Sequence, residues 1–237
     1  MCSSDLYAAS LEEVTAHHAE LFLDSATNAN DVYSAGSLSP TLATGRPDIY
    51  RYDPGDVRGA EVEAESRVSA GSYVDQSLML SLRGKALFYQ SSGFTEDLEV
   101  SGFFELRAWI SIDCPDTDLN ASIYEVTTEG NCIRLTTDAI RARYRQGLRS
   151  PKLINTTSPL SYEFARFTFI SKLIRRGHRL RLMIAPVGRL IDGLFTERNF
   201  NAGGTAADES ILDARPVTVK LFHEADYPSV LRVPIGR

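Results

Sequence analysis

Apolar and polar residues alternate in short runs from about Gly84 to the end of the chain, which is the pattern of half-buried β-strands. The alternation is clearest in VSGFFELRAWISI, where one side of the predicted strand carries Phe104, Leu106, Ala108, Ile110 and Ile112. The opposite side carries Glu105, Arg107 and Ser111 beside Trp109. We expect the apolar side to face the core.

The same logic predicts further strands in ASIYEV, CIRLTT, AIRARYR, ARFTFIS, HRLRLMI and PVTVKLF, separated by turn segments such as TEGN and RRG. Helical periodicity is almost absent from this part of the chain. Six or more short alternating strands without helices indicate an all-β protein, specifically an antiparallel β-sandwich.

The N-terminal part of the chain is less regular. SLEEVTAHHAELFLDS fits a helix with Ser10 as N-cap and Glu13 closing a capping box, but its end, ELFLDS, fits a short strand equally well. The segment SAGSLSPTLATGRPDIYRYDPGD is rich in Ser, Gly and Pro and should form an extended, irregular lead-in.

Composition limits the classes of partner. With 237 residues and 43% hydrophobic content, the chain can form one large domain, or one domain with a lead-in. A net charge of -6 disfavours binding to nucleic acid or to anionic membranes. The chain as given shows no apolar run near the ~18 residues of a membrane span and no signal-peptide pattern. We therefore expect a soluble protein, in a compartment that the sequence leaves undetermined.

The three cysteines, Cys2, Cys114 and Cys132, form neither a C-x-x-C pair nor an even disulfide framework. We expect ordinary thiols, although a bridge between Cys114 and Cys132 stays open because both flank one predicted hairpin.

Two arginine-rich segments could bind an anion. IRARYR places arginines at every second position, namely Arg141, Arg143 and Arg145. RRGHRLR surrounds His178 with Arg175, Arg176, Arg179 and Arg181. In a chain with 31 acidic residues, a solvated or acid-paired sheet face is the favoured interpretation.

The C-terminal stretch HEADYPSVLRVPIGR raises the question of a catalytic triad, because it contains His223, Glu224, Asp226 and Ser229. A triad needs its hydroxyl, imidazole and carboxylate to converge, whereas an extended chain separates His223 from Ser229 by about 20 Å. The nucleophile elbow G-x-S-x-G is absent from the chain. We expect Ser229 at the start of the last strand, with its hydroxyl bonded to backbone or solvent and His223 out of reach.

The remaining histidines, His17, His18 and His178, show no H-E-x-x-H or comparable metal-ligand spacing. We expect structural roles for all four histidines, with His178 exposed or bonded to backbone. The sequence therefore predicts no catalytic, cofactor-binding or metal-binding residue and no cofactor.

Seven segments in order resemble one known family: YRYDP, LFYQSSGFTEDLEVSG, DCPDTDLNASIYEV, IRARYR, RRGHRLRLMI, ERNFNAGG and HEADYPSVLRVPI. From about Leu21 to Arg237 the chain resembles the C-terminal domain of the X-prolyl dipeptidyl-peptidase and cocaine esterase (CocE/NonD) group of α/β-hydrolases. The resemblance implies a jelly-roll-like, galactose-binding-like β-sandwich that packs on a hydrolase domain. The family's Ser, Asp, His triad lies upstream of the matched part, so no catalytic residue carries over, and His223 matches the histidine of a terminal H-x-x-x-x-P-S motif.

The resemblance also suggests a division of the chain. Residues 1–20 form an uncertain N-terminal segment, either artefactual or a remnant of an upstream hydrolase domain. Residues 21–237 form the C-terminal β-sandwich domain, with 21–83 as its extended lead-in.

Several motif residues fit scaffold roles. Asp116 and Asp118 can cap backbone amides between strands, and Gly102 permits a tight strand entry. Left-handed backbone positions are expected in one long loop at Asn199, Asn201, Gly203 and Gly204. The insert GRLIDGLFTE after Ala185-Pro186-Val187 departs from the family pattern and leaves the substrate class open.

The leading hypothesis is therefore a non-catalytic domain of a serine hydrolase, either an acyl esterase or an X-Pro dipeptidyl-peptidase. Its partner would be the catalytic α/β-hydrolase domain of the same parent, with homo-oligomer contacts as a further option, and enzyme activity would belong to that parent. A free-standing jelly-roll module that binds carbohydrate through exposed aromatic residues is the alternative. A hydrolase with a tail-borne triad is the third and least favoured hypothesis.

Overall fold

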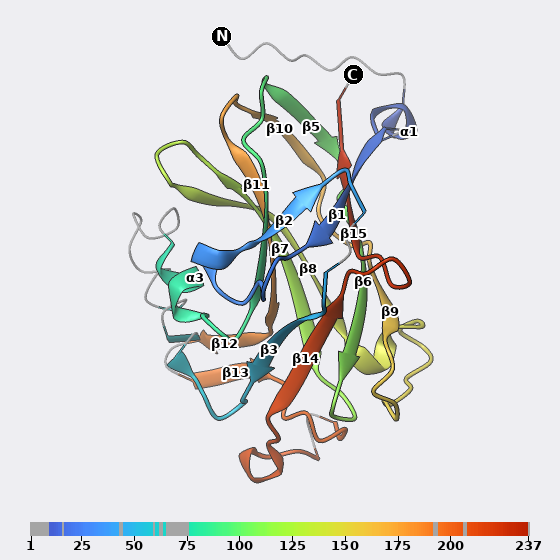
Figure 1. The fold of residues 1–237 in the computed structure, drawn as a ribbon. Helices are drawn as coiled ribbons and strands as arrows, with labels where there is room; N and C mark the ends of the chain where they lie inside the picture. The colour runs from blue at the N-terminus through green and yellow to red at the C-terminus, as the bar shows by residue number, and fades with distance from the viewer. Residues whose placement is uncertain are drawn as a thin grey trace.

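The computed structural model describes residues 10–15, 17–42, 45–58, 60–61, 64, 76–191, 194–205 and 208–236, which are almost entirely β-structure (Figure 1). The strands are β1 (His18–Asp24), β2 (Gly36–Ser39), β3 (Asp48–Tyr52), β4 (Leu87–Ser91), β5 (Leu98–Gly102), β6 (Glu105–Ile112), β7 (Asp118–Val126), β8 (Cys132–Arg141), β9 (Leu160–Phe164), β10 (Ile170–Ile174), β11 (Arg179–Pro186), β12 (Gly188–Ile191), β13 (Leu194–Arg198), β14 (Val217–Phe222) and β15 (Val230–Pro234). The helical turns are α1 (Leu11–Val14), η1 (Val32–Ser34), α3 (Ser77–Ser81), η2 (Ala142–Tyr144) and η3 (Ile211–Asp213).

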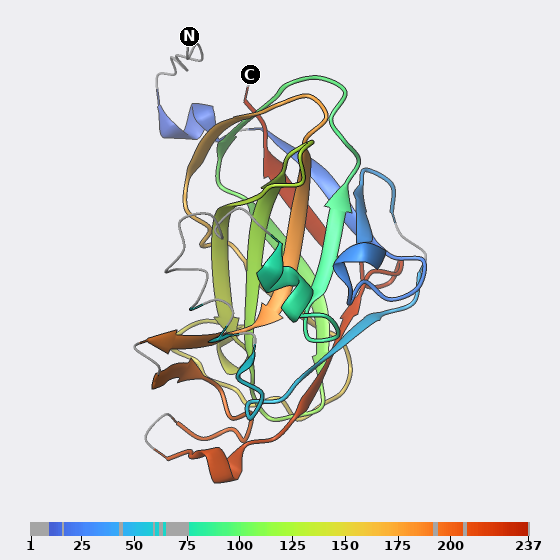
Figure 2. The same cartoon turned by 90° about the vertical axis from the view of Figure 1, so that its left-hand side faces the viewer.

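The strands form a β-sandwich. Eleven of them belong to one curled sheet with the order β3-β14-β6-β15-β1-β2-β4-β11-β7-β8, and β9 also pairs with β6. All of these pairs are antiparallel except β2 with β4. Figure 2 looks onto one layer, where β4, β11, β7 and β8 lie side by side. Two small sheets, β5 with β10 and β12 with β13, complete the fold. The predicted fold class is confirmed.

The core lies between the two layers, and the alternation predicted for β6 is confirmed because its apolar side is buried throughout. In β7 and β11 the burial is nearly continuous instead. The reason is that α3 covers the outer face of their layer, where Met79 packs with Phe88, Tyr124 and Met183 in a second apolar cluster (Figure 2). Strands covered on both faces lose the alternation of a half-buried sheet.

The lead-in is part of the sandwich. Its first strand, β1, lies between β15 and β2, and β3 pairs with β14 at the edge of the main sheet. The segment from Ser10 to Ser25, which fitted both a helix and a strand, contains both elements, because α1 is capped by the Ser10 side chain and β1 follows it. Within the described ranges, no helix combines the length and apolar character needed to cross a bilayer.

Two strand predictions were wrong in their details. ARFTFIS is not one strand, because residues 165–169 connect β9 to β10. The strand predicted over AIRARYR ends at Arg141, where the chain turns into the short helix η2. The predicted turns are confirmed at Gly130 and Gly177, which have φ angles of 86° and 84°, and the tight strand entry is confirmed at Gly102, with φ at 133°.

One edge of β6 pairs with two different strands in turn. The first part of β6 faces β15, with Arg107 opposite Val230, and the second part faces β14, with Trp109 opposite Phe222. Ser229 lies where the partner changes. Its Oγ accepts a hydrogen bond from Trp109 N at 2.9 Å and donates one to Phe222 O at 2.6 Å. The Ser229 hydroxyl thereby joins β6 to β14 at the point where β6 changes its partner strand. The prediction that this hydroxyl bonds to backbone is confirmed.

Replacement of this serine should destabilise the fold. In Ser229→Ala, the Trp109 N–H and the Phe222 carbonyl lose their partner inside the protein, which should lower the free energy of unfolding by about 1–3 kcal/mol. Urea unfolding followed by tryptophan fluorescence measures the change. Ser161→Ala is the control, because that hydroxyl bonds only to the surface carboxylate of Glu163 and its loss should cost under about 0.5 kcal/mol. Equal stability of both variants would contradict the assigned role.

Candidate functional site

The residues of the C-terminal stretch do not assemble into a triad. Ser229 is fully buried and its hydroxyl bonds to backbone atoms of β6 and β14. His223 instead directs Nε2 to Asp48 Oδ2 at 3.1 Å. Asp226 is exposed in the intervening loop. The hydroxyl, imidazole and acid therefore lack the connected geometry of a nucleophile, its base and an orienting carboxylate.

His223 belongs to a buried cluster centred on Asp48, which we call the Asp48 cluster. The carboxylate and the imidazole are both fully buried. Three further donors bind the carboxylate: Ser25 Oγ at 2.6 Å, Tyr89 Oη at 2.6 Å and Ala29 N at 2.8 Å. The donors come from the lead-in, from β4 and from the segment after β14, so this one acid ties together three distant parts of the chain.

Electrostatics keep the Asp48 carboxylate charged. Burial by itself would raise its pKa, but hydrogen bonds from His223, Ser25, Tyr89 and Ala29 outweigh that effect and hold the pKa below its usual value. Burial, together with the adjacent negative charge, raises the pKa of Tyr89 far above its ordinary range. A serine, a histidine and an aspartate do meet here, but the carboxylate sits between the hydroxyl and the imidazole. To activate a serine, the imidazole must lie between the hydroxyl and the carboxylate.

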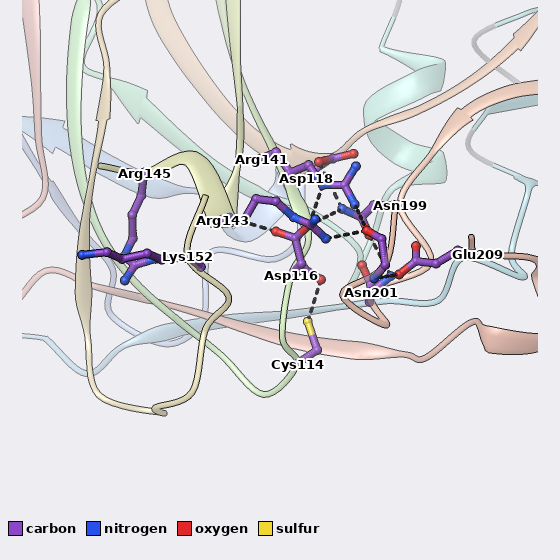
Figure 3. Close-up of polar contacts among 11 residues, drawn as sticks. Cys114, Asp116, Asp118, Arg141, Arg143, Arg145, Lys152, Asn199, Asn201 and Glu209 are labelled. Carbon is purple, nitrogen blue, oxygen red and sulfur yellow. Dashed lines mark hydrogen bonds and ion pairs between the residues drawn. The ribbon is translucent and has the colours of Figure 1, made fainter. Parts of the chain in front are cut away.

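A second buried acid, Asp116, organises the end of the sandwich where β7 begins (Figure 3). Its Oδ2 accepts from Arg141 Nε at 2.5 Å and from Arg143 Nε at 2.7 Å, and its Oδ1 accepts from Arg143 N at 2.8 Å. We call these three residues, with the groups that bind them, the Asp116 cluster. It confirms an acid-paired role for two of the three arginines in IRARYR, and it confirms that Asp116 caps a backbone amide.

The same arginines hold the loop that follows β13. Arg141 and Arg143 each donate from Nη2 to the Gly204 carbonyl, at 3.2 and 2.6 Å. Asn199 donates to Asp118 Oδ1 at 3.2 Å, and burial raises the pKa of Asp118. In Figure 3 these side chains converge from β7, β8 and the loop onto one small region.

Backbone geometry in this loop partly matches the expectation. Asn201 and Gly203 have φ angles of 64° and 93°, as predicted for left-handed positions. Asn199 and Gly204 do not have positive φ, so their prediction was wrong. Asn199 uses its side chain instead, accepting the Asn201 N–H at 2.8 Å and donating to Asp116 and Asp118.

Two of the other histidines, His178 and His18, have hydrogen-bond partners within the protein. His178 lies 2.6 Å from Glu125 Oε1 through Nδ1, so the expectation of an exposed or backbone-bonded ring was wrong. Lys172 Nζ lies 2.5 Å from the other oxygen of the same buried carboxylate. His18 bonds to the Phe103 carbonyl at 3.1 Å. Across the part of the chain that the structure describes, no three His, Cys, Asp or Glu side chains are grouped as a metal site would require.

The open question of a disulfide is settled, because Cys114 and Cys132 are both free and buried. Cys114 Sγ donates to the Asp116 carbonyl at 3.1 Å, and Cys132 Sγ lies 3.7 Å from Met79 Sδ in the cluster under α3. Burial raises the pKa of Cys114 to about 12 and that of Cys132 to about 11, so both thiols stay protonated and unreactive near neutral pH. Cys2 lies outside the described residues.

The outer face of β6 and β14 carries a shallow hollow of about 320 Å³, lined by Ser111, Ile112, Asp113, Thr157, Thr218, Lys220 and Phe222. Beside it, the Trp109 and Tyr227 rings pack edge to face at 5.3 Å, and Phe222 packs on Tyr227 in the same way at 5.8 Å. These rings cover one another and are only half exposed. They do not form the open, flat platform on which a sugar ring stacks.

Removal of the acid from the Asp116 cluster should be strongly destabilising. In Asp116→Asn, two guanidinium groups lose the carboxylate that neutralises them in a buried setting, so the free energy of unfolding should fall by about 3–5 kcal/mol. Urea unfolding gives that value, and hydrogen exchange at residues 199–205 should rise. Asp97→Asn removes the exposed pair with Arg175 and should cost under about 1 kcal/mol. A similarly small loss for Asp116→Asn would show that the buried acid does not hold this end of the sandwich.

The Asp48 cluster should make stability depend on pH in the acid range. Since the folded pKa of Asp48 lies below its unfolded value near 3.8, its stabilisation is complete above about pH 5 and is lost as the pH falls through the folded pKa. Urea unfolding between pH 7 and pH 2.5 should show this loss in the wild type and less of it in Asp48→Asn. Asp226→Asn, an exposed control, should keep the wild-type profile. Identical profiles for the wild type and Asp48→Asn would refute the prediction.

Comparison with known proteins identifies the family of this chain. Residues 8–186 match the family model described as the X-Pro dipeptidyl-peptidase C-terminal non-catalytic domain. The chain is 27% identical over 219 residues to the cocaine esterase of Rhodococcus sp. (strain MB1 Bresler), covering 90% of this chain and 37% of that protein.

Solved structures share the fold. An α-amino acid ester hydrolase superposes with a TM-score of 0.74 at 18% identity, over 92% of this chain and 36% of its own. An aminopeptidase from a marine sediment archaeon, Thaumarchaeota archaeon, gives a TM-score of 0.75 at 20% identity, over 93% of this chain and 37% of its own. The chain thus spans little more than a third of the length of these relatives. The chain belongs to the family of X-Pro dipeptidyl-peptidase C-terminal non-catalytic domains.

Proposed function

We propose that this chain is the non-catalytic β-sandwich of a serine hydrolase of the acyl esterase or X-Pro dipeptidyl-peptidase type. It packs on the catalytic α/β-hydrolase domain of the same parent and shapes its cleft. The observation that carries the proposal is the match to the family of non-catalytic domains, together with relatives whose chains are about two and a half times as long. Cocaine esterase and α-amino acid ester hydrolase both act on esters by name, which favours an acyl substrate.

The chemistry of the described residues supports a non-catalytic role. The serine and histidine of the C-terminal stretch are occupied by structural bonds, and both described cysteines keep their protons. The acids with the most partners, Asp48 and Asp116, are fully buried and cannot reach a substrate in solution. A carbohydrate-binding module has weaker support, because the aromatic rings beside the outer hollow pack against each other.

The isolated chain should therefore show no hydrolase activity. We expect neither p-nitrophenyl acetate nor an X-Pro p-nitroanilide to be hydrolysed above the buffer rate, whereas the same chain joined to its hydrolase domain should be active and blocked by a serine-directed inhibitor. Initial rates by absorbance measure both cases. Turnover by the isolated chain that the inhibitor abolishes, and that Ser229→Ala also removes, would overturn the proposal.

A further inference from the structure

An exposed loop beside the Asp116 cluster carries cations that have no acidic residue near them in the sequence. No Asp or Glu occurs between Asp138 and Glu163, whereas that stretch contains five cationic residues. Two of these residues, Arg141 and Arg143, form ion pairs with Asp116. We call residues 145–153 the basic loop. It carries the other three, Arg145, Arg149 and Lys152, and none of them forms an ion pair with a described residue.

The basic loop also exposes apolar side chains. Residues 146–153 are exposed without interruption, and among them Leu148 and Leu153 are 66% and 48% exposed. Large apolar side chains beside unpaired cations resemble the centre and rim of a protein interface more than a solvated loop.

Hydrogen bonds hold the basic loop in one shape. Lys152 N donates to the Arg143 carbonyl at 2.8 Å, and Ile154 N donates to the Pro115 carbonyl at 2.8 Å. Arg145 Nη1 donates to the Lys152 carbonyl at 3.1 Å, which closes the loop (Figure 3). Both ends are thus fixed to residues next to Asp116. A surface fixed in advance loses less entropy when it binds.

We propose that the basic loop is the surface on which the parent's hydrolase domain docks, through an acidic face that also presents apolar side chains. The proposal rests on the function proposed above, which supplies the partner. Nearly two thirds of each relative's chain lies outside the part that this chain matches, so a covering domain of sufficient size is available. The loop's charge selects the complementary face of that domain.

Other occupants fit the charges less well. In a two-fold dimer of this chain, the basic loop of one copy would face that of the other and bring six cations together. The net charge of the chain is -6, so an anionic membrane would be repelled by the surface that surrounds the basic loop. An acidic protein face meets neither obstacle.

The test measures binding of the intact chain to its separately purified cognate hydrolase domain by biolayer interferometry at 50 mM and 500 mM salt. Arg149→Glu/Lys152→Glu should weaken binding at least about tenfold at low salt, and the loss should shrink at high salt because exposed charges are screened. Leu148→Asp should weaken binding at both salt concentrations, since it places a charge in an apolar contact. All of these positions are exposed, so thermal unfolding should stay near that of the wild type.

Arg179→Glu is the matched control. It is an exposed charge reversal at the opposite end of the layer, because Arg179 pairs with Val126 whereas the basic loop follows Arg141, which pairs with Asp118. Its affinity should equal that of the wild type. If the wild type binds and the basic-loop variants bind equally well, the docking surface is overturned while the proposed function stands.

Two other results are decisive in different ways. If the wild type fails to bind the hydrolase domain at all, the proposed function falls and the docking surface with it. If the basic-loop variants lose binding to phosphatidylserine vesicles but keep wild-type affinity for the hydrolase domain, the loop is a lipid-binding surface and the proposal is overturned.

Discussion

The structure depends on two buried carboxylates, those of Asp48 and Asp116, each of which accepts hydrogen bonds from several segments of the chain. A carboxylate removed from water is stable only when its oxygens find donors, and these donors must come from whichever segments can reach it. Asp48 draws its donors from residues 25, 29, 89 and 223, and Asp116 draws its donors from β8, η2 and the loop after β13. Each acid therefore fixes the relative positions of segments that local hydrogen bonding alone would leave independent.

The same constraint explains why the histidine and serine of the C-terminal stretch are not arranged as a base and a nucleophile. An imidazole can act as a base only if one nitrogen faces the group that loses a proton and the other is held by an acid. The His223 ring is buried with Nε2 on Asp48, and its Nδ1 lies 3.6 Å from Asp24 Oδ1 without a hydrogen bond. Both sides of the ring thus face acids, and no hydroxyl stands in line to be activated.

Much of the fold could be predicted from sequence because the relevant information is local. Alternation in β6 and turn glycines at positions 130 and 177 depend only on neighbouring residues. The same alternation predicted the β-sandwich, and the residues of the PDTD segment predicted that Asp116 caps a backbone amide, as it does for Arg143. The end of β8 at Arg141 was missed, since the alternation in IRARYR continues beyond the point where Arg143 turns toward Asp116.

Other features had no signal in the sequence. The Asp48–His223 contact joins residues 175 positions apart, and neither residue lies in a motif whose spacing indicates the other. The continuous burial of β7 and β11 depends on α3, a five-residue helix that periodicity cannot detect. Such contacts join residues that are far apart in the sequence, so they can be identified only once the arrangement of the strands is known.

A non-catalytic domain can influence catalysis in a neighbouring domain through the rigidity of the surfaces it presents. Cleft walls and docking surfaces work best when they do not rearrange, because each mobile residue adds an entropic cost to every binding event. In this sandwich a buried ion cluster holds the connecting loops at one end. Since charged hydrogen bonds are directional, they fix the course of the backbone more closely than apolar contacts of similar strength. The Asp116 cluster thus connects the order of the sheet to the loops at residues 145–153 and 199–205, so the position of those loops is set by the sandwich.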